Sequence, residues 1–180
     1  GDIILNNKPN KTLVIEEDVS FIVRDMMRSA VTKGIATKAQ IRKYNKGIPV
    51  AGKTGTTSSK YDAWFTGITP YYAGVTWFGT DYNIPLDEGS GVSAEFWSYV
   101  MKNIHKDLPD RDFSKPDNII KRVVDTKSGK IPTDLSYMDP RNTVISEYFI
   151  QGTQPREVDD IHVQANICKE SEKLATEYCL

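Results

Sequence analysis

The sequence is poor in cysteine and histidine, has no long apolar run, and carries almost no net charge. Its 180 residues include two cysteines and two histidines, and the formal net charge is −1. So small a charge argues against a nucleic-acid-binding protein held by a broad basic surface. No apolar run approaches the ~20 residues of a membrane-spanning helix. His105 and His162 lie far apart and no Cys/His cluster has zinc-site spacing, so we predict no metal site and no cofactor.

The N-terminus also lacks the features of an export signal. Residues 1–4 bring neither a basic segment nor a long apolar segment, and there is no initiator methionine. We interpret Gly1 as an internal position of a longer protein, with any signal or membrane anchor upstream.

The two cysteines, Cys168 and Cys179, lie close together near the C-terminus. Their number alone is compatible with free thiols as well as with a disulfide. The segment 166–180 is short and polar, and a disulfide would hold such a segment against fraying. We therefore predict a Cys168–Cys179 bridge, which places the protein outside the reducing cytosol.

The composition is sufficient for a folded core, with 39% apolar and 26% charged residues. Hydrophobic periodicity and β-propensity predict helices over 18–33 and 92–106, and strands over 48–56, 63–69 and 72–79. Short connections between consecutive strands imply an antiparallel meander. We therefore expect an α+β fold in which helices pack on an antiparallel sheet.

Two apolar features are predicted to lie in this core. The first helix carries apolar residues at i, i+3, i+4 and i+7 spacing: Val19, Ile22, Val23, Met26, Met27, Ala30 and Val31. Trp64 lies in the second strand, where a tryptophan is by default a buried structural residue.

A domain boundary is expected near residue 107. Residues 1–107 form the main domain, and residues 108–180 form a linker and a small C-terminal extension. The linker, 108–118, contains Pro109 and Pro116. Beyond it we predict a strand over 119–125, a hairpin turn at 128–130 and a short strand at 148–150.

The segment around Lys53 permits two opposed interpretations. Gly47-x-x-x-x-Gly52-Lys53-Thr54 satisfies the phosphate-binding P-loop pattern. A P-loop requires backbone N–H groups around the phosphate and a helix after the loop. Pro49 has no N–H to donate, and the residues after Thr54 are poor helix formers. These features argue against a nucleotide-binding protein.

The second interpretation is the Lys-Thr-Gly strand of penicillin-recognising enzymes. Thr54 and Thr56 are two apart and share a face, so their hydroxyls can bind a substrate carboxylate together. Lys53 adds a positive charge, and Gly55 lets a substrate approach the backbone closely. The backbone N–H of Thr56 is a candidate oxyanion donor for acyl transfer, and Thr57 completes the predicted substrate-binding stretch.

The flanking residues extend this pattern over most of the chain. The stretches are Lys33-Gly34-Ile35-Ala36-Thr37, Gly52-Lys53-Thr54-Gly55-Thr56-Thr57, Asp62-Ala63-Trp64-Phe65-Thr66-Gly67-Ile68-Thr69-Pro70, Val75-Thr76-Trp77-Phe78-Gly79-Thr80-Asp81 and Phe149-Ile150-Gln151-Gly152-Thr153-Gln154-Pro155. In order and spacing they resemble the C-terminal part of the transpeptidase domain of class A (bifunctional) penicillin-binding proteins. Ile35 departs from that family's Gly-Thr-Ala segment, and the resemblance is weakest over 82–145.

The resemblance implies a penicillin-binding transpeptidase fold and roles for single residues. Lys53 takes the position of the lysine that supports the acylation centre. Thr54 and Thr56 take the positions of the residues that hold the carboxylate of D-alanine or of a β-lactam. The N–H of Thr56 takes the position of an oxyanion donor. The family's nucleophilic Ser-x-x-Lys and its Ser-x-Asn motif are absent from the 180 residues. Thr57-x-x-Lys60 has the first spacing, but it follows the strand directly.

The implied function is therefore that of a peptidoglycan D,D-transpeptidase fragment, with the isolated chain predicted to be inactive. Its implied partners are the D-Ala-D-Ala stem peptide, β-lactams and the missing upstream part of the protein, on the extracytoplasmic face of a bacterial membrane. Alternatives on the same fold are a β-lactamase or D,D-carboxypeptidase and a non-catalytic β-lactam sensor or wall-binding module.

Overall fold

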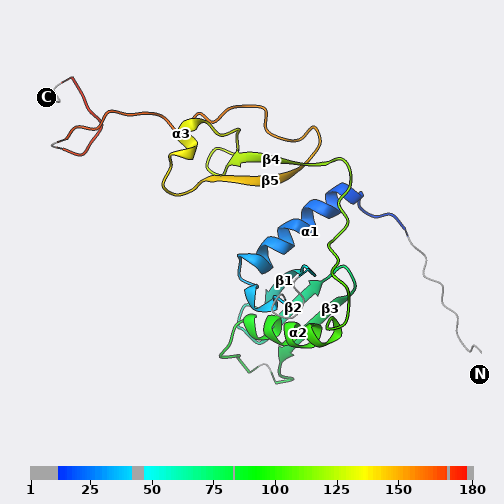
Figure 1. The fold of residues 1–180 in the computed structure, drawn as a ribbon. Helices are drawn as coiled ribbons and strands as arrows, with labels where there is room; N and C mark the ends of the chain where they lie inside the picture. The colour runs from blue at the N-terminus through cyan, green and yellow to red at the C-terminus, as the bar shows by residue number, and fades with distance from the viewer. Residues whose placement is uncertain (1–11, 42–46, 83, 170, 178–180) are drawn as a thin grey trace, which may run out of the picture. The chain divides into compact units, whose positions relative to one another are not determined.

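The computed structural model describes residues 12–41, 47–82, 84–169 and 171–177. The chain forms two compact units, Gly1–Pro116 and Asp117–Leu180 (Figure 1). Residues 108–116, which the sequence analysis assigned to the second part, fall in the first unit. The Tyr71 hydroxyl donates to the Pro109 carbonyl at 2.9 Å, and the Gly47 N–H donates to Asp110 Oδ1 at 3.2 Å. These contacts tie the linker to the first unit.

The first unit is an antiparallel meander with helices, which confirms the α+β prediction. Its elements are α1 (Glu17–Thr32), the 3₁₀ turn η1 (Thr37–Ala39), β1 (Ala51–Thr56), β2 (Asp62–Ile68), β3 (Ala73–Gly79) and α2 (Gly91–Ile104). The strand order is β1-β2-β3, and both pairings are antiparallel. The connections between consecutive strands are too short for a crossover, so consecutive strands pair with each other and run antiparallel.

The core of this unit is built around Phe65 of β2 and Trp97 of α2, whose rings meet edge to face with centroids 5.3 Å apart. The indole N–H of Trp97 donates to the Gly74 carbonyl at 3.0 Å. A Cβ on Gly67 would lie 2.6 Å from a ring carbon of Trp97. Glycine in β2 and β3 is therefore what lets α2 approach the sheet closely enough to bury this tryptophan.

The first helix buries only part of the face that its spacing predicted. Phe21 and Val31 are its buried residues. Val19, Val23 and Met26 of the predicted core face are exposed, at 42%, 48% and 66%. The prediction is wrong for these three, because periodicity identifies an apolar face but does not show which neighbour covers it.

The second unit is a two-stranded antiparallel sheet with one short helix. Its elements are β4 (Ile119–Asp125), α3 (Asp134–Tyr137) and β5 (Val144–Ile150), and the strand register pairs Ile119 with Ile150 and Asp125 with Val144. Thr133 begins α3 with a capping box that it shares with Ser136. In the part of the chain that the structure describes, no helix is long and apolar enough to cross a membrane.

The C-terminal segment contains Cys168, one of the two cysteines of the predicted disulfide. Cys168 is disulfide-bonded, and its backbone N–H donates to the Lys173 carbonyl at 2.8 Å. Cys179 lies outside the described residues, so its pairing with Cys168 stays a prediction.

Candidate functional site

The Lys-Thr-Gly segment forms β1, which lies at one end of the sheet order β1-β2-β3 (Figure 1). Within the described residues, one of its two edges pairs with β2 and the other has no strand beside it. An edge strand of this kind can accept a peptide as a further strand. Among the described residues, no strand takes up the main-chain groups of that edge.

The direction of the backbone groups in β1 follows from one hydrogen bond at its end. The Thr57 N–H donates to the Asp62 carbonyl at 3.2 Å and so points toward β2. Backbone N–H groups alternate in direction along a strand. The N–H groups of Gly55 and Lys53 therefore face β2, and those of Thr56 and Thr54 face the free edge. The candidate oxyanion donor points away from the sheet.

Lys53 brings its charge to the same edge. Its side chain is exposed, and its ammonium donates to the Thr54 carbonyl at 2.8 Å. In an antiparallel strand the carbonyl of a residue points the same way as its N–H, so the Thr54 carbonyl also faces the free edge. The result is a positive charge beside an outward-facing main-chain amide, a combination suited to a carboxylate-bearing peptide.

The three threonines of the segment have different surroundings. Thr54 is 8% exposed, because it pairs with Phe65 and paired residues share a face of the sheet. Thr56, two residues further on, is exposed. Thr57 lies in the turn, where its hydroxyl oxygen accepts the Asp62 N–H at 3.0 Å. Of the two hydroxyls expected to act together, that of Thr56 is the accessible one.

The turn after β1 excludes the phosphate-binding interpretation of this segment. The Lys60 N–H donates to the Thr57 carbonyl at 2.9 Å, and Lys60 has a left-handed φ of 56°. The chain then enters β2 instead of a helix. A P-loop needs a helix N-terminus at this point. The same turn shows that Thr57-x-x-Lys60 is not carried on a helix.

Trp64, the neighbour of Gly55 across the β1–β2 pair, is more accessible than predicted. It is 43% exposed and stacks at a tilt on Trp77, with ring centroids 6.2 Å apart. The indole N–H of Trp77 in turn donates to Asp62 Oδ1 at 2.8 Å. The prediction that Trp64 is a core residue is therefore wrong. It lies on the sheet face opposite Phe65, since successive side chains alternate along a strand.

A second polar cluster lies in the second unit. Among the described residues, Asp125, Asp159 and His162 are grouped closely enough to hold a metal ion. The sequence pattern does not reveal this cluster, because Asp125 lies at least 34 residues before Asp159 and His162, and only the fold brings it beside them.

Two family models match the chain, one for each unit. Residues 3–104 match the penicillin-binding protein transpeptidase domain. Residues 115–164 match the C-terminal domain of penicillin-binding protein 1A. The chain belongs to the penicillin-binding protein transpeptidase family. The resemblance to class A penicillin-binding proteins that the sequence suggested is thereby confirmed.

Individual penicillin-binding proteins match along almost the whole chain. Penicillin-binding protein 1A of Clostridium botulinum (strain Langeland) is 41% identical over 99% of the chain and 21% of its own length. That of Clostridium novyi is 37% identical over 99% of the chain and 20% of its own length. The crystal structure of penicillin-binding protein 1A from Haemophilus influenzae matches with a TM-score of 0.62 and 26% identity, over 81% of this chain and 22% of that one. The chain thus spans about a fifth of the length of these relatives, and its fold is a partial transpeptidase fold.

Proposed function

We propose that the chain supplies the substrate-binding strand of a peptidoglycan D,D-transpeptidase that joins stem peptides by serine acyl transfer. The observation that carries this proposal is the free edge of β1. It presents the Thr56 N–H outward and holds the Lys53 ammonium 2.8 Å from the Thr54 carbonyl. The match to the transpeptidase family model over residues 3–104 supports it.

In this proposal a peptide ending in D-Ala-D-Ala lies along β1 as an added strand. The terminal carboxylate is held by the charge of Lys53 and by the hydroxyl of Thr56, because the Thr54 side chain is buried. Gly55, which has no side chain, leaves room for the peptide main chain. The Thr56 N–H stabilises the oxyanion that forms when the scissile carbonyl is attacked. A β-lactam takes the same place and acylates the enzyme.

The attacking serine belongs, in this proposal, to another part of the protein. The 180 residues contain neither Ser-x-x-Lys nor Ser-x-Asn, and the relatives are about five times longer than the chain. The first unit exposes apolar side chains on β3 and α2 that such a part would cover: Val75 at 58%, Phe78 at 48%, Phe96 at 58% and Tyr99 at 67%.

The proposed location is the extracytoplasmic face of the bacterial cell membrane. The substrate, peptidoglycan, lies on that side, and the disulfide at Cys168 suits a compartment outside the reducing cytosol. In the proposal, the link to the membrane is an anchor in the further part of the protein.

The proposal is tested by substituting Lys53→Ala in the longer protein that contains this chain. Loss of the ammonium removes the charge beside the carboxylate, so we expect covalent labelling by a fluorescent penicillin to slow about 10²-fold. Lys60→Asn is the matched control, because it removes a nearby charge while asparagine tolerates the left-handed φ at that position. A Lys53→Ala protein that is labelled as fast as its parent would contradict the proposal.

A further inference from the structure

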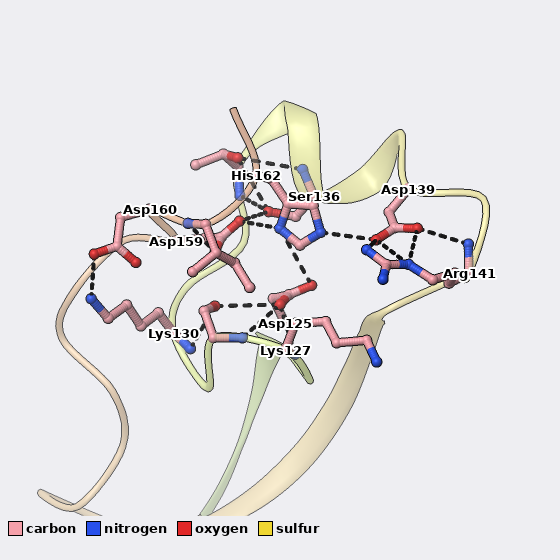
Figure 2. Close-up of polar contacts among 12 residues, drawn as sticks. Asp125, Lys127, Lys130, Ser136, Asp139, Arg141, Asp159, Asp160 and His162 are labelled. Atoms are coloured by element: carbon pink, nitrogen blue, oxygen red, sulfur yellow. Dashed lines mark hydrogen bonds and ion pairs between the residues drawn. The ribbon is translucent and has the colours of Figure 1, made fainter. Parts of the chain in front are cut away.

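Three buried carboxylates converge on one histidine in the second unit (Figure 2). Asp125 ends β4, Asp139 follows α3, and Asp159 and His162 come from the segment after β5. The carboxylates are 0%, 9% and 7% exposed. His162 Nδ1 lies 2.6 Å from Asp159 Oδ2, and its Nε2 lies 3.0 Å from Asp139 Oδ2. The ring is therefore held between two carboxylates, with the third beside it.

The positive charge around this cluster is scarce. Arg141 forms a two-pronged pair with Asp139, with its Nη2 at 2.6 Å and its Nε at 2.9 Å from the two oxygens. Lys130 is occupied by Asp160 and Glu157. Arg141 is thus the one cation in direct contact with any of the three carboxylates among the described residues, which leaves an excess of negative charge away from water.

One oxygen of the cluster has no hydrogen-bond partner although it is fully buried. Asp125 Oδ1 accepts the N–H groups of Lys127 and Ser128 at 2.8 and 2.9 Å. Asp125 Oδ2 accepts none, and His162 Nδ1 lies 4.0 Å away, beyond hydrogen-bond distance. The Thr143 hydroxyl, a neighbour of this carboxylate, is likewise buried and lies outside hydrogen-bond geometry with any described partner. Buried polar atoms are rarely left unsatisfied, and an unseen ion is one of the regular explanations.

We propose that Asp125, Asp159 and His162 bind a divalent transition-metal ion, with Zn²⁺ as the best fit. Two carboxylates and one imidazole suit Zn²⁺, whereas Ca²⁺ and Mg²⁺ prefer oxygen ligands alone. The candidate ligand atoms all lie within 4.8 Å of one another. Tetrahedral bonds of about 2.1 Å place ligand atoms about 3.4 Å apart. The 2.6 Å contact of His162 with Asp159 and the 4.0 Å contact with Asp125 straddle that value, so small side-chain rotations suffice.

The surroundings of His162 support coordination through Nδ1. Its other nitrogen faces Asp139 at 3.0 Å. A carboxylate in this position fixes the proton on Nε2, as second-shell carboxylates do for metal-bound histidines. In the proposal, Nδ1 exchanges its 2.6 Å contact with Asp159 Oδ2 for the metal, which both atoms then bind.

The bound ion would stabilise the second unit by cross-linking two of its segments. That unit has a two-stranded sheet and a helix of four residues, which is little core for independent stability. The three ligands come from β4 and from the segment after β5, so one ion would tie these parts together. Small units commonly gain stability from such a metal.

The test is calorimetric titration of ZnCl₂ into the metal-stripped, oxidised 180-residue chain. We expect one saturable site, no comparable binding of Ca²⁺ or Mg²⁺, and a loss of affinity of at least about tenfold in Asp125→Asn. Asp160→Asn is the matched control, because Asp160 lies next to Asp159 but pairs with Lys130. We expect it to bind Zn²⁺ as the parent does.

A second measurement on the unaltered chain covers the case in which Asp125→Asn does not fold. Zn²⁺ should shift the Nδ1 resonance of His162 in nitrogen-15 NMR and leave that of His105, buried in the first unit, unchanged. The absence of a saturable site, equal affinity in folded Asp125→Asn and the parent, preference for Ca²⁺ or Mg²⁺, or a shift confined to His105 would each overturn the proposal.

Discussion

In the proposed function, Thr56 offers the substrate two groups of different kinds. Its hydroxyl is carried by an exposed side chain, and its N–H faces the free edge because the Thr57 N–H faces β2. In the proposal the side chain holds the carboxylate, and the outward-facing main-chain N–H is the oxyanion donor. Substitutions at this one position can therefore separate the two roles.

At the residue scale, we predict that Thr56→Pro slows acylation by penicillin far more than Thr56→Val. Proline removes the N–H and is tolerated on an edge strand whose N–H faces outward, so loss of the oxyanion donor should cost about 10²–10³-fold in rate. Valine keeps the N–H and removes only the hydroxyl, so its effect should be smaller. Labelling kinetics with fluorescent penicillin on the longer protein measure both. Equal rates in the two variants, with both folded by circular dichroism, would rule out the N–H as the donor.

The strand period allowed the sequence to predict which residues of β1 share a face, whereas the roles of single residues stay predictions. The exposure of Lys53 and Thr56 agrees with what β1 needs as a substrate edge. The exposure of Trp64 was not predictable, because residue type suggests burial whereas the side of the sheet depends on what packs there. The grouping of Asp125, Asp159 and His162 could not be predicted from the sequence either, because it depends on how the fold brings distant segments together.

At the scale of elements, glycines in the strands let α2 pack closely on the sheet. A Cβ on Gly67 would lie 2.6 Å from Trp97 Cζ2 and 2.7 Å from Phe65 Cε1. We predict that Gly67→Ala lowers the free energy of unfolding of the first unit by about 1–3 kcal/mol, the usual cost of overpacking a core. Urea unfolding of the full chain, followed by tryptophan fluorescence, measures this.

Gly89→Ala is the control for that measurement, because a Cβ at Gly89 meets nothing within 4 Å. It makes the same chemical change outside the core and should leave the midpoint close to that of the parent. If Gly67→Ala and Gly89→Ala unfold at the same urea concentration, the close approach of α2 to the sheet does not depend on that glycine.

Elements with strong patterns were predicted closely, and short ones were not. The strand over 119–125 agrees with β4 at both ends, and the helix over 18–33 differs from α1 (Glu17–Thr32) by one residue at each end. The helix α3 was missed, because its four residues, Asp134–Tyr137, are too few to show a period. Its signal is the capping pair Thr133 and Ser136, which is visible in the sequence only once a helix is suspected there.

At the scale of the whole molecule, the chain holds one side of a proposed active site. The binding edge lies on β1, whereas neither serine motif of the family occurs in the 180 residues. We predict that the isolated chain is not labelled covalently by fluorescent penicillin, because no nucleophile is present to open the lactam ring. Gel fluorescence after denaturation measures this, with the longer protein as the positive control. A covalent adduct on the isolated chain would contradict the prediction.

The most direct test of the central claim is a crystal structure of the longer protein acylated by a β-lactam. The account predicts that the drug lies along the free edge of β1. The oxygen of its acyl carbonyl should accept the Thr56 N–H at about 2.9 Å, and its carboxylate should lie against Lys53 and Thr56. An acylated drug whose carbonyl and carboxylate both lie away from residues 53–56 would contradict the account.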